Sequence, residues 1–352
     1  MRNFTFFICL FLLYSGYAFP TETAKPKEGE GIYRFLLSHG RNPKEHYDLF
    51  VELNKKQLGR NNSLIKDVSY ILPPLSINVV TATSETFVIN PSSTKIIRTP
   101  DPKNLKKNTF IEPLFGKKYD EYTLQSNKLS GATFYLVSGH GGPDCGAIGY
   151  VEGTAIHEKE YAYDIMLRLA RNLMMEGATV HIIIQNKYKG IRDEAFLKHD
   201  KRETCQGKDL PRSQKKRLQQ RCDAINSLSV KSKNAYQRAL FIHLDSRSNN
   251  TRLDVFFYHN HTSVAGKRLA HTMRTTFRDQ YQKVQPGRGF TGTVSSRNLH
   301  VLENTNPVSL FAELGNIQNK LDQDRFLLSD NRQALANWMC RGFIADYENS
   351  KK

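Results

Sequence analysis

Apolar and polar residues follow two different periods along the chain, and the change between these periods divides the sequence into regions. After residue 131, short apolar runs typical of strands alternate with longer stretches that place apolar residues on one helical face. Strands are predicted at 133–138, 179–184, 240–244, 253–258 and 310–314, and helices at 158–176, 264–282 and 330–346. This alternation predicts a layered α/β domain over residues 131–348.

The region before this domain has a different pattern. Two stretches between 31 and 75 place apolar residues at helical spacing, and residues 70–72 close the segment before two prolines. This stretch of about 45 residues is small for independent folding. A polar connector is predicted at 19–30, and a linker with some strand content, at 77–80 and 86–89, is predicted within 76–130.

The first 18 residues have the parts of a secretory signal peptide. Arg2 gives a positive start, residues 4–14 are an almost unbroken apolar run, and small residues precede a cleavage position near Ala18. The apolar run is shorter than the roughly 20 residues that a membrane-spanning helix needs. The sequence therefore predicts a secreted or periplasmic protein without a permanent membrane anchor.

Cleavage there would leave four cysteines in an oxidising compartment, namely Cys145, Cys205, Cys222 and Cys340. An even number of cysteines in such a place is compatible with disulfides. Four cysteines allow three pairings, and the sequence does not choose among them. A disulfide between Cys205 and Cys222 is the pairing that we expect.

The chain is strongly basic. Its 51 Lys and Arg residues exceed its 34 Asp and Glu residues by 17, and they are spread along the whole chain. Such a balance favours a polyanionic partner, and both nucleic acid and an anionic cell envelope fit. Because the sequence has no zinc-finger or RNA-recognition motif, we expect no nucleic-acid partner. An ordinary solvated basic surface is the alternative.

Chemically useful side chains lie where predicted elements begin or end. His140 follows an apolar strand in a glycine-rich turn, Glu158 opens a predicted helix, and His243 lies on an otherwise apolar strand. Two imidazoles and one carboxylate are a known ligand set for catalytic zinc, with one position left open for water. Such a site needs a base, and Glu313 at the end of an apolar strand is the candidate, since an unpaired carboxylate is costly to bury.

Each of these residues also has an ordinary structural explanation when it is taken alone. A histidine on a buried strand is more often a hydrogen-bonded core residue than a ligand. An acidic residue in the first turn of a helix, such as Glu158, is favoured by the helix dipole. The hypothesis of a metal site therefore depends on the residues occurring together.

Four motifs resemble the zinc-dependent N-acetylmuramoyl-L-alanine amidases, and they occur in the order found in that family. SGHGGPDCGAIG at 138–149 is similar to the glycine-rich turn of the family. The later motifs are EKE at 158–160, FIHLDS at 241–246 and FAELGNIQNKLDQD at 311–324, followed by a stretch that looks like the closing helix. The resemblance extends over residues 130–347.

This resemblance implies a fold, a site and a reaction. The fold would be a mostly parallel twisted sheet flanked by helices. One zinc ion per chain would be bound by His140, Glu158 and His243, and Glu313 would be the catalytic carboxylate. The substrate would be peptidoglycan, cut between N-acetylmuramic acid and L-alanine.

A second resemblance concerns residues 31–75, which are similar to a LysM module. The matching features are GIYRFLLSHG at 31–40, Asn54, and YILPP at 70–74. The usual opening strand and its Gly-Asp-Thr turn are replaced by EGEG at 28–31. The resemblance implies a small α+β unit that binds glycan, and an ordinary helical cap on the larger domain is the alternative.

Two features depart from the amidase pattern. In HLDS, Asp245 stands where the family has small residues, so we expect it to alter the pocket. The basic stretch at 186–236 is longer than usual, and we interpret it as a solvated surface helix held by the expected disulfide. The alternative is a lid over the site, which would make the isolated enzyme weakly active and dependent on an activator protein.

Three other functions can be compared with this interpretation. A lipase-like esterase would need a GxSxG motif, which the sequence lacks. A non-catalytic peptidoglycan-binding protein is disfavoured because all four expected chemical positions are filled. An amidase that acts on a different amide stays open, since these residues do not distinguish between amide substrates.

Overall fold

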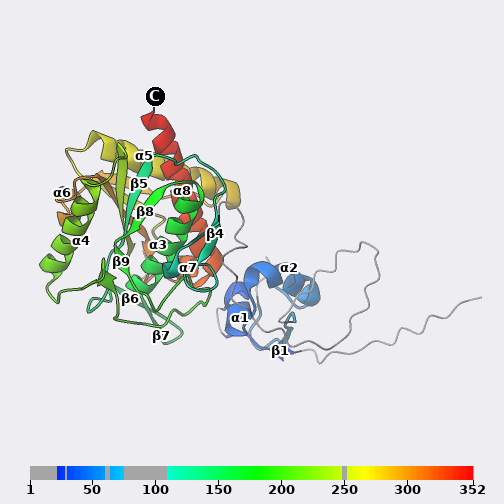
Figure 1. Cartoon of the computed structure of the whole chain (residues 1–352). Helices are drawn as coiled ribbons and strands as arrows, with labels where there is room; N and C mark the ends of the chain where they lie inside the picture. The colour runs from blue at the N-terminus through cyan, green and yellow to red at the C-terminus, as the bar shows by residue number, and fades with distance from the viewer. Residues whose placement is uncertain (1–21, 28–29, 60–63, 75–108, 248–251, 352) are drawn as a thin grey trace, which may run out of the picture. The chain divides into compact units, whose positions relative to one another are not determined.

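The computed structural model describes residues 22–27, 30–59, 64–74, 109–247 and 252–351 (Figure 1). The chain divides into two compact units, Met1–Ile97 and Arg98–Lys352, which we describe separately. The expected signal peptide and the expected strands at 77–80 and 86–89 lie outside the described residues. Among the described helices, none combines the length and the apolar character needed to cross a membrane.

The first unit consists of two helices and one pair of strands. Strand β1 (Thr23–Ala24) pairs antiparallel with β2 (Tyr70–Ile71), and helices α1 (Ile32–Ser38) and α2 (Pro43–Asn54) come between them in the sequence. The core of this unit is formed by Ile32, Phe35, Leu36, Phe50, Tyr70 and Leu72. An opening strand is therefore present, and it lies within the segment that we expected to be a connector.

Asn54 joins the end of α2 to β2. Its Nδ2 donates to the carbonyl oxygens of Phe50 at 2.9 Å and Ile71 at 2.8 Å, and its Oδ1 accepts the backbone N–H of Ile71 at 2.8 Å. A buried amide must be hydrogen-bonded in this way if it is not to destabilise the fold. Asn54 thus has a structural role, and the assignment of the unit as a LysM module stays a prediction.

A six-stranded sheet forms the centre of the second unit. Across the sheet the strands are β14 (Thr293–Ser296), β13 (Phe256–His259), β15 (Val308–Asn316), β12 (Tyr236–Asp245), β5 (Ala132–Ser138) and β8 (Thr179–Ile182). All neighbouring pairs are parallel except β13 with β15. The expectation of a mostly parallel α/β sheet is confirmed.

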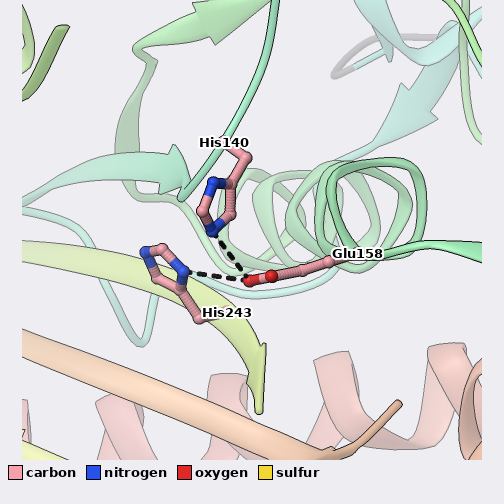
Figure 2. Close-up of side chains that lie close together, drawn as sticks. All are labelled: His140, Glu158 and His243. Atoms are coloured by element: carbon pink, nitrogen blue, oxygen red, sulfur yellow. Dashed lines mark hydrogen bonds and ion pairs between the residues drawn. The ribbon is translucent and has the colours of Figure 1, made fainter. Parts of the chain in front are cut away.

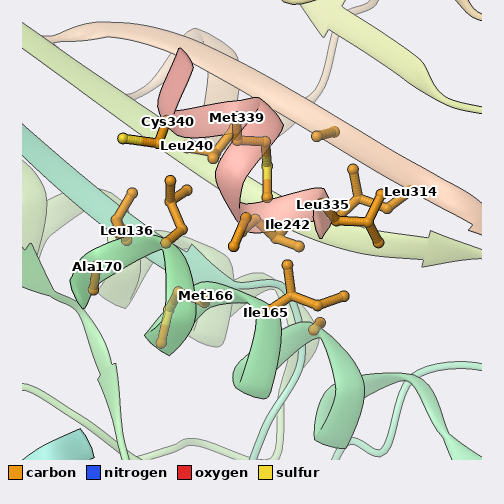
Figure 3. Close-up of a cluster of buried hydrophobic side chains, with 14 of the residues drawn as sticks. Leu136, Ile165, Met166, Ala170, Leu240, Ile242, Leu314, Leu335, Met339 and Cys340 are labelled. Carbon is orange, nitrogen blue, oxygen red and sulfur yellow. The ribbon is translucent and has the colours of Figure 1, made fainter. Parts of the chain in front are cut away.

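The two faces of the sheet pack against different helices (Figure 1). One face, with Leu136, Leu240 and Ile242, contacts α3 (Glu158–Met175), α5 (Val264–Val284) and α8 (Ser329–Ser350) in the larger core, part of which is drawn in Figure 3. The other face contacts α4 (Gln214–Ser229) and α6 (His300–Glu303).

His243 belongs to the α4 side of the sheet. Phe241 packs in the hydrophobic cluster that includes Cys222 and Ile225 of α4. Because alternate residues of a strand point to the same face, His243 lies on that side with Phe241. The smaller face of the sheet, which α4 covers, is therefore the one that carries His243.

Shorter elements complete the second unit. They are β3 (Thr109–Ile111), η3 (Pro113–Phe115), β4 (Glu121–Thr123), the hairpin β6 (Ile148–Val151) and β7 (Thr154–His157), the small sheet of β9 (Ile184–Gln185), β10 (Thr204–Cys205) and β11 (Lys208–Asp209), and α7 (Lys320–Leu327). Phe115 and Leu129 are fully buried in the larger core. The last part of the expected linker therefore packs with the second unit.

Two strand predictions differ from the structure in their bounds. The strand expected at 179–184 ends at Ile182, and Ile184 begins β9, which pairs with β10 in a separate sheet. The strand expected at 253–258 begins only at Phe256. The backbone before it is held by side chains of α7, because the N–H of Leu253 donates to Oδ2 of Asp322 at 2.8 Å.

The expected disulfide between Cys205 and Cys222 is not formed, and both residues are buried free thiols. Sγ of Cys205 lies 3.8 Å from the carbonyl oxygen of Gln220, and Sγ of Cys222 lies 3.7 Å from Oγ1 of Thr305. The two sulfur atoms have different partners. This prediction was wrong because sequence spacing does not report whether two Cβ vectors converge.

Candidate metal centre

The glycine-rich turn after β5 places His140 at the carboxyl edge of the parallel strands. The N–H of Gly139 donates to the carbonyl oxygen of Ile242 at 2.9 Å, which continues the pairing of β5 with β12 to the start of the turn. Gly141 and Asp144 then exchange backbone hydrogen bonds. His140 is therefore held beside β12, at the edge where ligands bind in open α/β sheets.

Glu158 reaches the same place from the first turn of α3. Its Oε2 accepts the N–H of Ala147 at 2.8 Å, and its Oε1 accepts the N–H of Leu244 at 3.0 Å. Burial opposes the charge of this carboxylate, but the two neighbouring imidazoles and these donors hold the pKa of Glu158 well below its usual range. The side chain is consequently an ionised carboxylate that is held in a fixed position.

Figure 2 shows His140 and His243 pointing at one oxygen of Glu158. Nε2 of His140 lies 3.2 Å and Nδ1 of His243 lies 3.0 Å from this Oε1 atom. One ligand atom from each of the three residues fits within 4.8 Å of the others. The structure thus brings together the three residues that the sequence suggested as metal ligands, and their donor atoms fit a zinc ion.

Two glycines leave the space that the cluster occupies. A Cβ atom on Gly139 would lie 1.9 Å from Cε1 of His243, and one on Gly146 would lie 2.6 Å from Oε2 of Glu158. Gly146 also has a φ of 70°, which favours glycine. These glycines of the motif are required by the close approach of the turn to the ligands.

Asp144 and Arg217 orient His140 from the side away from Glu158. Oδ2 of Asp144 lies 3.0 Å from Nδ1 of His140 and 2.7 Å from a terminal nitrogen of Arg217. A carboxylate behind a ligand imidazole fixes the orientation of the ring. Although burial opposes protonation, Glu158 and Asp144 together raise the pKa of His140 to about 10. Binding of a metal ion must therefore release a proton from this ring.

Glu313 lies next to this cluster but is not part of it. In the parallel pairing of β12 with β15, Glu313 is the register partner of His243. Within the described part of the chain its Oε2 is buried and has no hydrogen-bond partner. Burial, with the nearby charges of Glu158 and Asp245, raises the pKa of Glu313 well above its ordinary value. A carboxylate with these properties can accept and return a proton.

A buried ionic network also supports the glycine-rich turn. Glu203 accepts the N–H of Gly142 at 2.9 Å, and it pairs with Lys159 at 3.1 Å and with Lys189 at 2.7 Å. Lys189 also pairs with Glu160 at 2.7 Å. Lys159 and Glu160, which follow the ligand Glu158, therefore have structural roles, and the basic stretch helps to build the site.

Replacing Glu203 with alanine is expected to lower the free energy of unfolding by about 3 kcal/mol, because it leaves buried lysine charges without their partner. The measurement is chemical denaturation of the native protein and the variant. The matched control is Asp209→Ala, at an exposed acidic residue of the same stretch, which should change stability by less than about 0.5 kcal/mol. Equal effects of the two changes would contradict the role of Glu203.

The helix of the basic stretch is not fully solvated. One side of α4 is buried and contributes Arg217, Arg221, Cys222, Ile225 and Ser229 to the interior. Of these residues, Arg217 and Arg221 line a cavity of about 190 Å³, together with Gly139, His140, His243 and Phe311. The expected disulfide is absent, and the helix of the basic stretch is a surface helix whose buried side packs on the sheet and forms one wall of this cavity.

Sequence reasoning gave no role to Asp144, Arg217 or Arg221. Asp144 stood within the glycine-rich motif without an assigned function, and the two arginines were counted as surface charges. The two arginines are four residues apart and each is followed by an apolar residue, Leu218 or Cys222, so they lie on one side of the helix next to apolar residues. This pattern could have predicted that Arg217 and Arg221 are buried.

Comparison with protein-family models now gives the class of the protein. Residues 135–345, more than half of the 352 residues, match the model Amidase_3, described as N-acetylmuramoyl-L-alanine amidase. The chain belongs to this family of amide hydrolases, which act on peptidoglycan. The family expectation is confirmed, and the matched range contains all four site residues. No curated protein sequence matches the chain.

Solved structures with a similar fold include several amidases. The N-acetylmuramoyl-L-alanine amidase AmiC2 of Nostoc punctiforme is 21% identical, covers 63% of this chain and 99% of its own, and has a TM-score of 0.44. Ami1 from Mycobacterium smegmatis is 18% identical with coverages of 63% and 99% and a TM-score of 0.45. The CwlD amidase from Clostridioides difficile, solved in complex with the GerS lipoprotein, is 16% identical with coverages of 62% and 98% and a TM-score of 0.46.

Proposed function

We propose that the protein is a secreted, zinc-dependent enzyme that hydrolyses the amide bond between N-acetylmuramic acid and L-alanine in peptidoglycan. The observation that carries this proposal is the cluster of His140, Glu158 and His243, with Glu313 at the neighbouring register position. This cluster lies within the region that matches the amidase family.

The proposed roles divide between metal binding and proton transfer. His140, Glu158 and His243 hold one zinc ion, which supplies Lewis acidity and makes water acidic enough to ionise near neutral pH. Glu313 accepts the proton of the attacking water, since its buried Oε2 has no other partner among the described residues. Glu313 then returns this proton to the nitrogen of L-alanine as the amide bond breaks.

The two units have different functions in this proposal. The unit built from β1, α1, α2 and β2 binds glycan as a LysM-like module, and the second unit cuts the amide. The order of one strand, two helices and one strand supports this assignment. An activator protein is a further proposed partner: a protein that moved α4 would widen the cavity beside the ligands.

Removal and return of the metal tests the proposed function. The native protein is dialysed against a chelator, and one half is reloaded with one equivalent of zinc. We expect the reloaded protein to release peptides with new L-alanine amino termini from purified peptidoglycan, and the metal-free protein to release at least about 10³-fold fewer, because Lewis-acid stabilisation contributes several kcal/mol.

Three outcomes would contradict the proposal. If the metal-free protein released as many peptides as the reloaded protein, zinc would have no role in the reaction. Sedimentation of the reloaded protein with peptidoglycan, without any release of peptides, would instead support a non-catalytic binding protein. Release of a different amino terminus would point to another amide bond.

A further inference from the structure

A buried arginine without a partner lies in the wall of the cavity beside the ligand cluster. Arg221 of α4 is only 1% exposed. Its Nε and Nη2 atoms are buried and have no hydrogen-bond partner in the described part of the chain. The same side chain lines the cavity of about 190 Å³ to which His140 and His243 also contribute.

Asp144, a carboxylate that lines the same cavity, already has other partners. Asp144 contacts His140 and pairs with Arg217, which lies one helical turn before Arg221. Arg217 is further bound to the carbonyl oxygen of Pro211 at 3.1 Å. Asp144 therefore pairs with Arg217, and the buried Nε and Nη2 atoms of Arg221 have no partner among the described residues.

An unmatched buried guanidinium is costly. Moving a charge from water to an apolar interior is unfavourable unless an anion and hydrogen bonds replace the lost hydration. Leu218, Phe241, Val301 and Phe311 give this cavity apolar walls, so water screens the charge poorly there. The arrangement is accordingly suited to an anion that enters the cavity with the substrate.

We propose that Arg221 forms a carboxylate-binding subsite for the stem peptide. This inference rests on the proposed function and specifies its substrate. The ligand is the free α-carboxylate of the residue that follows the scissile L-alanine. In the substrate this carboxylate is close to the amide bond that would be cut beside His140 and His243. The planar guanidinium donates two parallel hydrogen bonds to a carboxylate, a geometry that a carboxamide cannot match.

Two ligands that differ at a single group test the subsite. They are N-acetylmuramoyl-L-alanyl-D-glutamate, with an α-carboxylate, and N-acetylmuramoyl-L-alanyl-D-isoglutamine, with an α-carboxamide. Calorimetric titration uses the zinc-loaded Glu313→Gln variant, so that the ligands stay intact. We expect the carboxylate ligand to bind about 10- to 100-fold more tightly, and we expect Arg221→Met in the same background to abolish this preference.

The controls separate binding from folding. Lys216→Met, at an exposed residue of the same helix, should keep the preference. Circular dichroism and zinc content show whether Arg221→Met is folded, and Arg221→Lys should restore part of the preference because it returns the charge without the planar donors. Comparison of the two ligands needs no change at Arg221, so the test holds even if the methionine variant does not fold.

The outcomes distinguish this inference from the proposed function. Equal affinity for the two ligands, or a preference that persists in folded Arg221→Met, would overturn the carboxylate subsite. With enzyme that has Glu313, we expect Arg221→Met to raise KM for carboxylate substrates and to change kcat little. If the native enzyme releases no peptides and the carboxylate preference is still present and lost in Arg221→Met, the proposed reaction fails and the subsite stands.

Discussion

Glutamine in place of Glu313 is expected to lower kcat for peptidoglycan by about 10²- to 10⁴-fold and to leave one zinc ion bound. Glutamine has nearly the same shape but cannot take a proton from water. The measurements are peptide release and zinc content of the same preparation. Glu303→Gln, at an exposed glutamate, is the matched control and should keep both activity and zinc.

The same variant has a second readout in the metal-free protein. Burial raises the pKa of Glu313 above its ordinary value of 4.5. When the pH is above this ordinary pKa, Glu313 still holds a proton in the folded protein but has lost it in the unfolded chain. The stability of the folded protein therefore falls as the pH rises towards the raised pKa. Glu313→Gln removes this titration. As pH rises above 4.5, the thermal midpoint should therefore fall less for the metal-free variant than for the metal-free native protein.

Loss of zinc from the Glu313→Gln variant would indicate that Glu313 is a metal ligand, and would contradict the proposal that it only transfers a proton. Equal pH dependence of the two metal-free proteins would contradict the raised pKa. A variant that retains zinc and nearly full turnover would assign the base to another residue.

Alanine in place of His243 is expected to remove zinc and activity together. The change leaves only His140 and Glu158 in the cluster, and two protein ligands are fewer than the three found in catalytic zinc sites. Without the metal we expect turnover to fall by about 10³-fold or more, from the loss of several kcal/mol of transition-state stabilisation. His261→Ala, at an exposed histidine, is the control.

Zinc affinity should also depend on pH. The pKa of His140 is raised to about 10 in the metal-free protein, and only the neutral imidazole binds a metal ion. Each unit of decrease in pH below that value should therefore weaken binding about tenfold through this ring. Competition with a chelator at several pH values measures this slope, and a flat profile would contradict either the raised pKa of His140 or its role as a ligand.

Most of the second unit could be predicted from its sequence because local pattern and tertiary structure agree there. The apolar runs of β5, β12 and β15 are buried on both faces, which is the pattern of parallel strands. The amphipathic stretch of α3 begins at Glu158, as expected. His140, Glu158 and His243 could be found because each follows or opens such an element.

Other features depend on contacts that no local pattern reports. The strand β14 has the sequence TVSS, and it forms because it pairs with β13. The direction of β13, antiparallel to β15, was also not predictable. Arg221 looked like a surface residue because a run of basic residues surrounds it. The error about Cys205 and Cys222 has the same cause, since the direction of a side chain is fixed by packing.

The pairing of β12 with β5 and β15 has a consequence for how the protein folds. Ile242 pairs with Ser138, and His243 pairs with Glu313, so the ligands and the base come from segments far apart in the chain. Contacts of such long sequence separation form slowly, because closing a long loop costs entropy before it gains contacts. The proposed metal site therefore forms only after the central ladder has formed. A zinc ion bound there would stabilise the finished domain, but it would not guide the early steps by which the chain finds its topology.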